Sequence, residues 1–228
     1  QVFGNFPSLF MGLVEPDGTW EHHGGRLRFT DASGSIIADQ LDPQKYYEYI
    51  SESVQNSSYL KSPYYSPLGF PDGMYRVGPL ARLNVAEQMG TPKADVELKK
   101  FKKLTRGRNA VTSSFHYHYA RLIEILTSIE RVEAYLDDTD LLSEDLRADA
   151  GINSLRGVGV SEAPRGTLFH DYTVDRDGLL KKVNLIVATG QNNLAMNQTV
   201  AQIARHYVRG NKIAEPMLNR VEHGIRCY

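Results

Sequence analysis

The stretch SEAPRGTLFHDY, residues 161 to 172, places one arginine in a backbone bend shaped by a proline and a glycine. Proline fixes φ and offers no N–H to a strand ladder, while the glycine after Arg165 lets a neighbouring backbone or a ligand approach closely. The segment from Val158 to Thr189 predicts a strand, a hairpin and a returning strand, with DRDG at 175 to 178 as the turn. We therefore expect the side chain of Arg165 to be presented to its surroundings and not packed in a core.

Two roles for Arg165 are open from this stretch alone. The arginine pairs with a nearby carboxylate such as Glu162, as many loop arginines do. Alternatively, it is a preorganised cation that faces an anion or a reacting group. Residues elsewhere in the chain are needed to choose between them.

Outside this stretch, the sequence predicts an α+β protein that is mainly α-helical, with two small antiparallel β insertions. Apolar residues recur every three or four positions between Phe115 and Val132, which predicts a helix with one face in the core. An Asp-Pro start at Asp42 predicts a helix through Val54, followed by an irregular stretch to Gly73. Within one domain over 1–228 we expect a β meander at 8–41, helices at 77–150, the arginine loop with its hairpin at 157–190, and helices at 193–228.

Composition indicates a soluble globular chain of 228 residues, of which 41% are hydrophobic and 23% are charged. A net charge of −1 gives no global basic field, so nucleic acid is not an expected partner. No apolar stretch approaches the roughly 20 residues that span a bilayer. The single cysteine, Cys227, excludes an internal disulfide framework, and we expect a cytoplasmic protein.

No motif for a nucleotide, a metal or a nucleophile is complete in this chain. The glycines at 157 and 159 begin like a dinucleotide fingerprint, but the third glycine is missing and Pro164 interrupts the expected helix. His116 and His118 lie about 200° apart around a helix and cannot share one metal. The histidines His22 and His23 could bind a metal, but no second pair of ligands accompanies them. Ser161 has no nucleophile elbow around it, and Cys227 is expected to be a packed thiol.

Four separated segments carry a resemblance to a known family. They are YRVGPLARLN at 75–84, SEAPRGTLFHDY at 161–172, KKVNLIVATGQNNLAMN at 181–197 and NRVEHGIRCY at 219–228. In this order they resemble the large subunit of nickel-iron hydrogenases, most of all the cytoplasmic, bidirectional, NAD-coupled type of cyanobacteria. The similarity runs over essentially the whole chain and implies part of the nickel-iron hydrogenase large-subunit fold.

The resemblance also implies a chemistry and a set of partners. In the family, four cysteines in two pairs hold a nickel-iron centre with cyanide and carbon monoxide ligands, and neither pair is present here. The chain therefore resembles a C-terminal part of the large subunit, cut one residue before the expected Asp-Pro-Cys, and we expect it to be inactive by itself. The full subunit is expected to cleave dihydrogen reversibly and heterolytically. Electrons would then pass to an iron-sulfur small subunit, and through flavin-containing diaphorase subunits to NAD.

Roles for individual residues follow from the same resemblance. Arg165 matches the arginine that faces the open position of the metal centre, where we expect it to act by electrostatics and positioning. Thr189 matches a hydroxyl residue that donates to an iron-bound cyanide. The other expected site residues are Ala163, Pro164 and Ala188 around the metal centre, and Glu162 and His170 as supporting residues; Gly78, Pro79, Ala81 and Arg82 match a segment expected to be structural.

Two alternatives remain at this point. One is a metal-free relative, such as the quinone-site subunit of respiratory complex I, which shares the fold but lacks the cysteine pairs. The other is a sister hydrogenase that is coupled to a deazaflavin or acts as a dihydrogen sensor.

Overall fold

The computed structural model describes residues 3–56, 58–105, 110–147, 153–210 and 213–228, and it combines three antiparallel or mixed sheets with six α-helices in that part of the chain. The strands are β1 (Leu9–Val14), β2 (Arg26–Thr30), β3 (Ile36–Leu41), β4 (Ile50–Gln55), β5 (Ser58–Tyr65), β6 (Tyr75–Arg76), β7 (Arg156–Ala163), β8 (Gly166–Val174) and β9 (Leu180–Ile186). The helices are α1 (Pro79–Val85), α2 (Pro92–Lys102), α3 (Tyr117–Leu136), α4 (Ala188–Gln191), α5 (Asn193–Tyr207) and α6 (Glu215–Ile225). Parts of the predicted 77–150 and 193–228 helical segments lie outside the described residues.

Strand β1 is the centre of the fold because both of its faces are buried. Its sheet has the order β3-β2-β1-β6, in which β1 pairs antiparallel with β2 and parallel with the short β6. Side chains alternate between the faces of a strand, so Phe10 and Val14 lie in one core cluster and Met11 and Leu13 in another. A strand buried on both faces has a continuous apolar sequence, as LFMGLV does.

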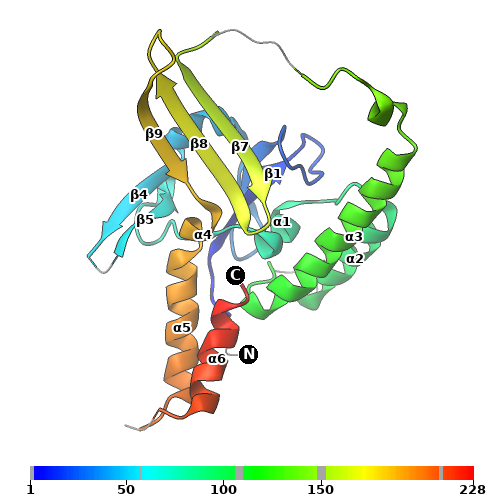
Figure 1. Cartoon of the computed structure of the whole chain (residues 1–228). Coiled ribbons are helices and arrows are strands. Elements are labelled where there is room, and N and C mark those ends of the chain that lie inside the picture. Colours follow the sequence, from blue (N-terminus) through cyan, green and yellow to red (C-terminus); the bar gives the residue numbers. More distant parts are fainter. Residues whose placement is uncertain (1–2, 57, 106–109, 148–152, 211–212) are drawn as a thin grey trace.

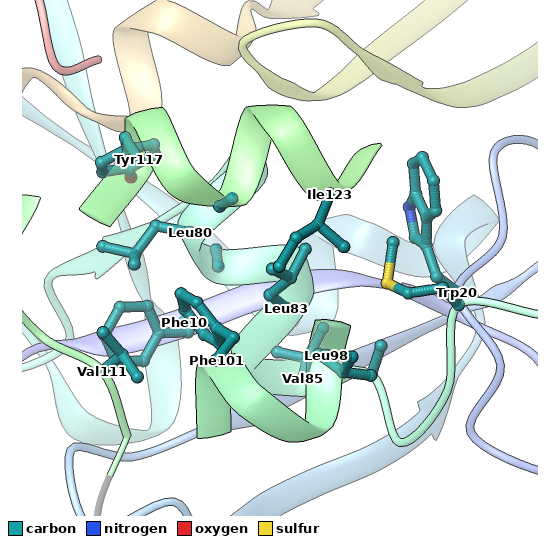
Figure 2. Packing of buried hydrophobic residues seen from close by; sticks show 14 of the residues in the cluster. Phe10, Trp20, Leu80, Leu83, Val85, Leu98, Phe101, Val111, Tyr117 and Ile123 are labelled. Atoms are coloured by element: carbon teal, nitrogen blue, oxygen red, sulfur yellow. The ribbon is translucent and has the colours of Figure 1, made fainter. Parts of the chain in front are cut away.

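Helices α1, α2 and α3 cover one face of this sheet (Figure 1). Phe10 lies there in one cluster with Leu80 and Leu83 of α1, Phe101 of α2 and Ile123 of α3 (Figure 2). The opposite face packs against β8 and β9 through Phe169 and Ile186. The sheets β3-β2-β1-β6 and β7-β8-β9 therefore share a core, and α1 lies close to the turn between β7 and β8.

The sheet β7-β8-β9 agrees with the predicted strand, hairpin and returning strand. Strands β1 to β3 likewise lie within residues 8–41 and pair in the antiparallel order of a meander. The β6 strand, which adds a fourth member to that sheet, has no counterpart in the sequence-based expectation. Helices α5 and α6 run side by side and extend away from the sheets (Figure 1).

The prediction of a helix from Asp42 to Val54 is wrong. Asp42 does cap a helical turn, but this is a short 3₁₀ helix over Pro43–Glu48, and the chain continues as β4. The stretch predicted to be irregular contains β5, which pairs with β4 in a third sheet that the sequence did not predict. The cause is an ambiguity of short apolar patterns: Tyr46 and Ile50 have helical spacing, yet each reaches the core from a different element.

The predicted core face of α3 is only partly correct, because Tyr119 and Leu126 pack against the core but most of the other predicted residues do not. The helix exists, but Leu122, Ile129 and Val132 are more than half exposed, whereas Ile123 and Thr127 are buried. The helix is apolar on two faces, and only one of them packs against the described residues. Periodicity detects an apolar face without telling which neighbour it meets. None of the described helices is long and apolar enough to cross a membrane.

Candidate functional site

Pro164 and Arg165 form the two-residue turn between β7 and β8, where Ala163 pairs with Gly166. Gly166 has a φ of 135°, and a Cβ built on it would lie 2.3 Å from Cγ2 of Val77. Gly78 has a φ of 89°, and its Cβ would lie 2.7 Å from the carbonyl oxygen of Arg165. Two glycines in backbone conformations that disfavour other residues therefore let the turn rest directly on the junction between β6 and α1.

The side chain of Arg165 is exposed, and it makes no ion pair or hydrogen bond to any residue that the structure describes. The carboxylate proposed as its partner, Glu162, binds Arg82 instead, with 2.8 Å between Nη1 and Oε2. Of the two roles left open by the sequence, the ion pair with Glu162 is thus absent. The geometry presents a free guanidinium at the tip of a hairpin whose backbone is fixed.

Glu162 is fully enclosed, and both of its oxygens are occupied. Its Oε1 accepts hydrogen bonds from the backbone N–H of Leu13 at 3.0 Å and from the hydroxyl of Thr167 at 2.9 Å. Because a buried carboxylate needs such partners, this one ties the hairpin to the central strand. This arrangement fits the expected loop-orienting role of Glu162.

Arg82 of α1 joins this carboxylate to a second one on α3. Its Nε and Nη2 donate to the two oxygens of Glu124 at 2.6 and 2.9 Å, and only 2% of its side chain is exposed. Burial by itself lowers the pKa of Arg82, but the charges of Glu124 and Glu162 raise it above its ordinary value. Arg82 is therefore permanently charged and bridges α1, α3 and the hairpin.

Two buried amides connect the Arg165 turn to α4. The backbone N–H of Asn192 donates to the carbonyl of Thr189 at 3.1 Å, and the Asn192 side chain donates to the carbonyl of Arg165 at 3.5 Å. Its Oδ1 accepts from the N–H of Val77 at 2.9 Å. Gln191 accepts from the hydroxyl of Tyr75 at 2.8 Å and donates to the carbonyl of Thr167. The segments that carry Arg165 and Thr189 are thereby held together.

The remaining candidate residues differ in their surroundings. Ala188 is buried at the start of α4, whereas Thr189 is half-buried and its hydroxyl has no hydrogen-bond partner in the described part of the chain. His170 lies further along β8, where Nδ1 is 2.8 Å from the hydroxyl of Tyr172. Within the described residues, the side-chain hydrogen bond and the ring contact of His170 are with Tyr172 and not with the turn, so the structure does not bring its side chain together with the other candidates.

A cavity of about 490 Å³ lies beside the hairpin. It is bounded by the β1–β2 connection, α3 and the end of β7; its lining residues are Trp20, His22, Arg82, Arg121, Glu124, Ile125, Ser128, Glu162, Ala163 and Pro164. Burial, followed by the charges of Arg131 and Arg82, lowers the pKa of His22, so this imidazole is neutral at pH 7. Among the described residues, no three His, Cys, Asp or Glu side chains are grouped to hold a metal ion.

Cys227 is a packed thiol, as expected. It is 1% exposed, its Sγ lies 3.3 Å from the carbonyl of His223, and burial raises its pKa to about 11. Because the thiolate is the nucleophile and the metal-binding form, this side chain is suited to packing and not to chemistry.

The sequence analysis did not predict a role in the site for three of its residues. Arg82 was expected to be only structural, and Gln191 and Asn192 were part of a matched segment without individual roles. A sequence indication exists for the two amides, since the polar run TGQNN directly follows an apolar strand. The role of Arg82 depends on partners that lie 42 and 80 residues away in the sequence, and no local pattern reveals them.

Comparison with known proteins gives one family. The family model for nickel-dependent hydrogenases matches residues 28–215. The chain is 42% identical over 99% of its length to the beta subunit of the NAD-reducing hydrogenase HoxS of Cupriavidus necator, covering 46% of that protein. It is 40% identical over 99% of its length to one chain of the F420-non-reducing hydrogenase of Methanothermobacter thermautotrophicus, covering 47% of it. The chain thus spans about half the length of these curated relatives.

Solved structures agree with this result. An NAD⁺-reducing nickel-iron hydrogenase in the H₂-reduced state superposes with a TM-score of 0.93 at 42% identity, over 99% of this chain and 50% of that one. A nickel-iron-selenium hydrogenase variant from Desulfovibrio vulgaris Hildenborough shares the fold, with a TM-score of 0.63 at 20% identity over 99% and 50% of the two chains. The fold predicted from the resemblance is therefore confirmed for this half of the large subunit.

Proposed function

The chain belongs to the nickel-dependent hydrogenase family, and from that premise we propose that it is part of the catalytic large subunit of a nickel-iron hydrogenase. The full subunit cleaves dihydrogen reversibly and heterolytically, and the Arg165 turn of this chain lies against the metal centre. The observation that carries the proposal is the free guanidinium of Arg165 on a turn whose backbone is fixed on several sides. The metal-free alternative is set aside because the matching family is nickel-dependent.

The residues at the turn fit a metal centre whose ligands come from elsewhere in the full subunit. The described residues around the turn offer the cation of Arg165 and, from α4, the unpaired hydroxyl of Thr189, and they contain no group of three His, Cys, Asp or Glu side chains that could hold a metal ion. When bound, the nickel-iron centre with its cyanide and carbon monoxide ligands supplies the Lewis acidity for splitting dihydrogen. Arg165 then stabilises negative charge that develops beside it, since a preorganised donor costs no reorganisation during the reaction. A guanidinium is not deprotonated in proteins, so an arginine is poorly suited to act as the base.

Electron transfer is assigned to partner subunits. We propose an iron-sulfur small subunit, diaphorase subunits that carry flavin and bind NAD, and a cytoplasmic location. The 42% identity to one component of an NAD-reducing hydrogenase supports this arrangement. The similarity to the F420-non-reducing relatives is nearly as high, so a sister hydrogenase with another electron acceptor is the second candidate.

The test is to purify the full-length large subunit with its partners and to measure dihydrogen-dependent reduction of NAD⁺ and of a viologen dye. Reduction of both acceptors supports the NAD-coupled enzyme. Reduction of the dye alone supports the sister hydrogenase. If the assembled protein binds nickel and reduces neither acceptor, the proposed function is wrong.

Replacement of Thr189 by valine tests the proposed hydrogen bond to an iron-bound cyanide. The Thr189 hydroxyl has no partner among the described residues, so the substitution should leave the melting temperature unchanged. In the assembled enzyme it should shift an infrared cyanide stretching band, whereas Thr189→Ser should preserve that band. A valine variant with the wild-type infrared spectrum would contradict this role.

The 228-residue chain by itself is expected to be inactive and to self-associate. The second apolar face of α3 supports this expectation, because Leu122, Ile125, Ile129, Val132 and Leu136 are all more than half exposed. Size-exclusion chromatography should give a size above that of the monomer, with concentration-dependent binding of a hydrophobic dye. A monomer that does not bind the dye, or one that oxidises dihydrogen, would contradict the prediction. Charged substitutions at Leu122 and Ile129 should restore the monomer, whereas the same change at the exposed Leu142, outside this face, should not.

A further inference from the structure

We propose that Arg82 is a positioning residue that fixes the backbone of the Arg165 turn, so that the free guanidinium of Arg165 points at the reaction centre. The inference rests on the proposed function and adds to it a residue that does not touch the reacting atoms. Arg82 lies in α1, on an element separate from the hairpin that it holds.

Every N–H of the Arg82 side chain has an acceptor available. Nη1 donates to Oε2 of Glu162 and to the carbonyl of Ala163, both at 2.8 Å. Nη2 donates to Oε2 of Glu124 at 2.9 Å and to the carbonyl of Pro164 at 3.3 Å, and Nε donates to Oε1 of Glu124 at 2.6 Å. A guanidinium has five N–H donors in a rigid planar fork, so five acceptors determine its position completely.

Three consecutive carbonyls of the turn are bound by side chains from outside the hairpin. Arg82 binds those of Ala163 and Pro164, and Asn192 binds that of Arg165. A loop whose carbonyls all point to water would sample several conformations. Here the backbone is fixed while the arginine side chain stays free, which is the arrangement that preorganised electrostatic stabilisation requires.

The burial and charge of Arg82 argue against a merely structural ion pair. One carboxylate would be enough to compensate its charge, but two are present, and two further donors go to the turn. The carboxylates come from α3 and β7, and together with Arg82 they line the cavity beside the hairpin. Gly78, the residue before α1, adds another contact between α1 and the turn, because its backbone packs directly against the carbonyl of Arg165.

Arg28 provides a matched control. It is 3% exposed, pairs with Asp39 at 2.8 Å and Glu87 at 3.2 Å, and donates to the carbonyl of Val85 at 3.2 Å. It therefore has the burial, the two carboxylates and the carbonyl contact of Arg82, but no contact with the turn. A lysine at either position loses the planar fork and retains the charge.

The experiment compares Arg82→Lys with Arg28→Lys in the full-length, assembled enzyme. We expect Arg82→Lys to lower kcat per bound nickel about 10- to 100-fold, with KM for dihydrogen little changed, because a misplaced catalytic group loses rate more than binding. The infrared cyanide bands should shift as well, since the charge beside the centre moves. Arg28→Lys should keep kcat per nickel within about two-fold and leave the bands in place.

Glu124→Gln is the second variant, and it decides the question if Arg82→Lys yields no nickel-loaded protein. The amide is nearly isosteric and can accept only one of the two hydrogen bonds, so kcat per nickel should fall and the bands should shift in the same direction. The inference is overturned if the Arg82 and Glu124 variants both load nickel and both match Arg28→Lys in kcat and in infrared bands. If only the Glu124 variant loads nickel, its match to Arg28→Lys is enough to overturn the inference. If wild-type enzyme itself shows neither nickel nor dihydrogen activity, the proposed function fails before any variant is compared.

Discussion

Replacing Arg165 with lysine in the full-length enzyme is expected to lower turnover about 100-fold while the nickel content stays unchanged. The side chain is exposed and makes no hydrogen bond or ion pair with the described residues, so its replacement should not disturb folding or metal insertion. Lysine keeps the charge but offers a single ammonium on a flexible stem, and the directional fork is lost. Turnover per nickel, measured with the melting temperature of the same preparation, checks both parts of the prediction.

The matched control is Arg176→Lys. Arg176 is exposed and lies in the turn between β8 and β9, so it occupies a hairpin of the same sheet at the end away from the Arg165 turn. Its replacement should leave turnover within about two-fold of wild type. If Arg165→Lys also retains near-normal turnover, the guanidinium does not act on the reaction.

The hairpin could be predicted from the sequence because the residues that determine it are local. Proline and glycine on either side of Arg165 predict a bend, and the DRDG turn predicts the returning strand, as β7, β8 and β9 now show. The resemblance located the same arginine and the threonine at the start of α4. Local sequence therefore predicted both the presentation of Arg165 and its freedom from the core.

Contacts between residues that are far apart in the chain could not be predicted from local sequence. The periodicity of α3 identified an apolar face, but it pointed to Leu122 and Ile129, whereas the face with Ile123 packs on the described core. The ion pair between Glu162 and Arg165, one of the two roles that the sequence left open for this arginine, joins residues that are close in sequence. The actual partner, Arg82, is brought there by the packing of α1 on β1, which no local pattern contains.

Replacing Gly166 with alanine is expected to destabilise the fold by about 2 to 5 kcal/mol and to displace the Arg165 turn. Its φ of 135° is one that residues with a Cβ rarely adopt. The added Cβ would also lie 2.3 Å from Cγ2 of Val77 and 2.8 Å from the backbone nitrogen of Gly78. Because the second of these atoms is backbone, a rotamer change at Val77 cannot relieve the overlap. The turn must move, so turnover per nickel should fall at least about 10-fold together with the melting temperature.

Gly159→Ala in β7 separates this effect from the general cost of replacing a glycine in the same sheet. A Cβ at Gly159 meets nothing within 4 Å, and its φ is not in the left-handed region. Alanine there should therefore leave the melting temperature unchanged or raise it slightly, with normal turnover, because it restricts the unfolded chain without strain. Equal melting temperatures and equal turnover for the two alanine variants would contradict the tight seating of the turn on the junction of β6 and α1. A lower turnover only for Gly166→Ala would show that the position of the turn, and not the mere presence of Arg165, sets the rate.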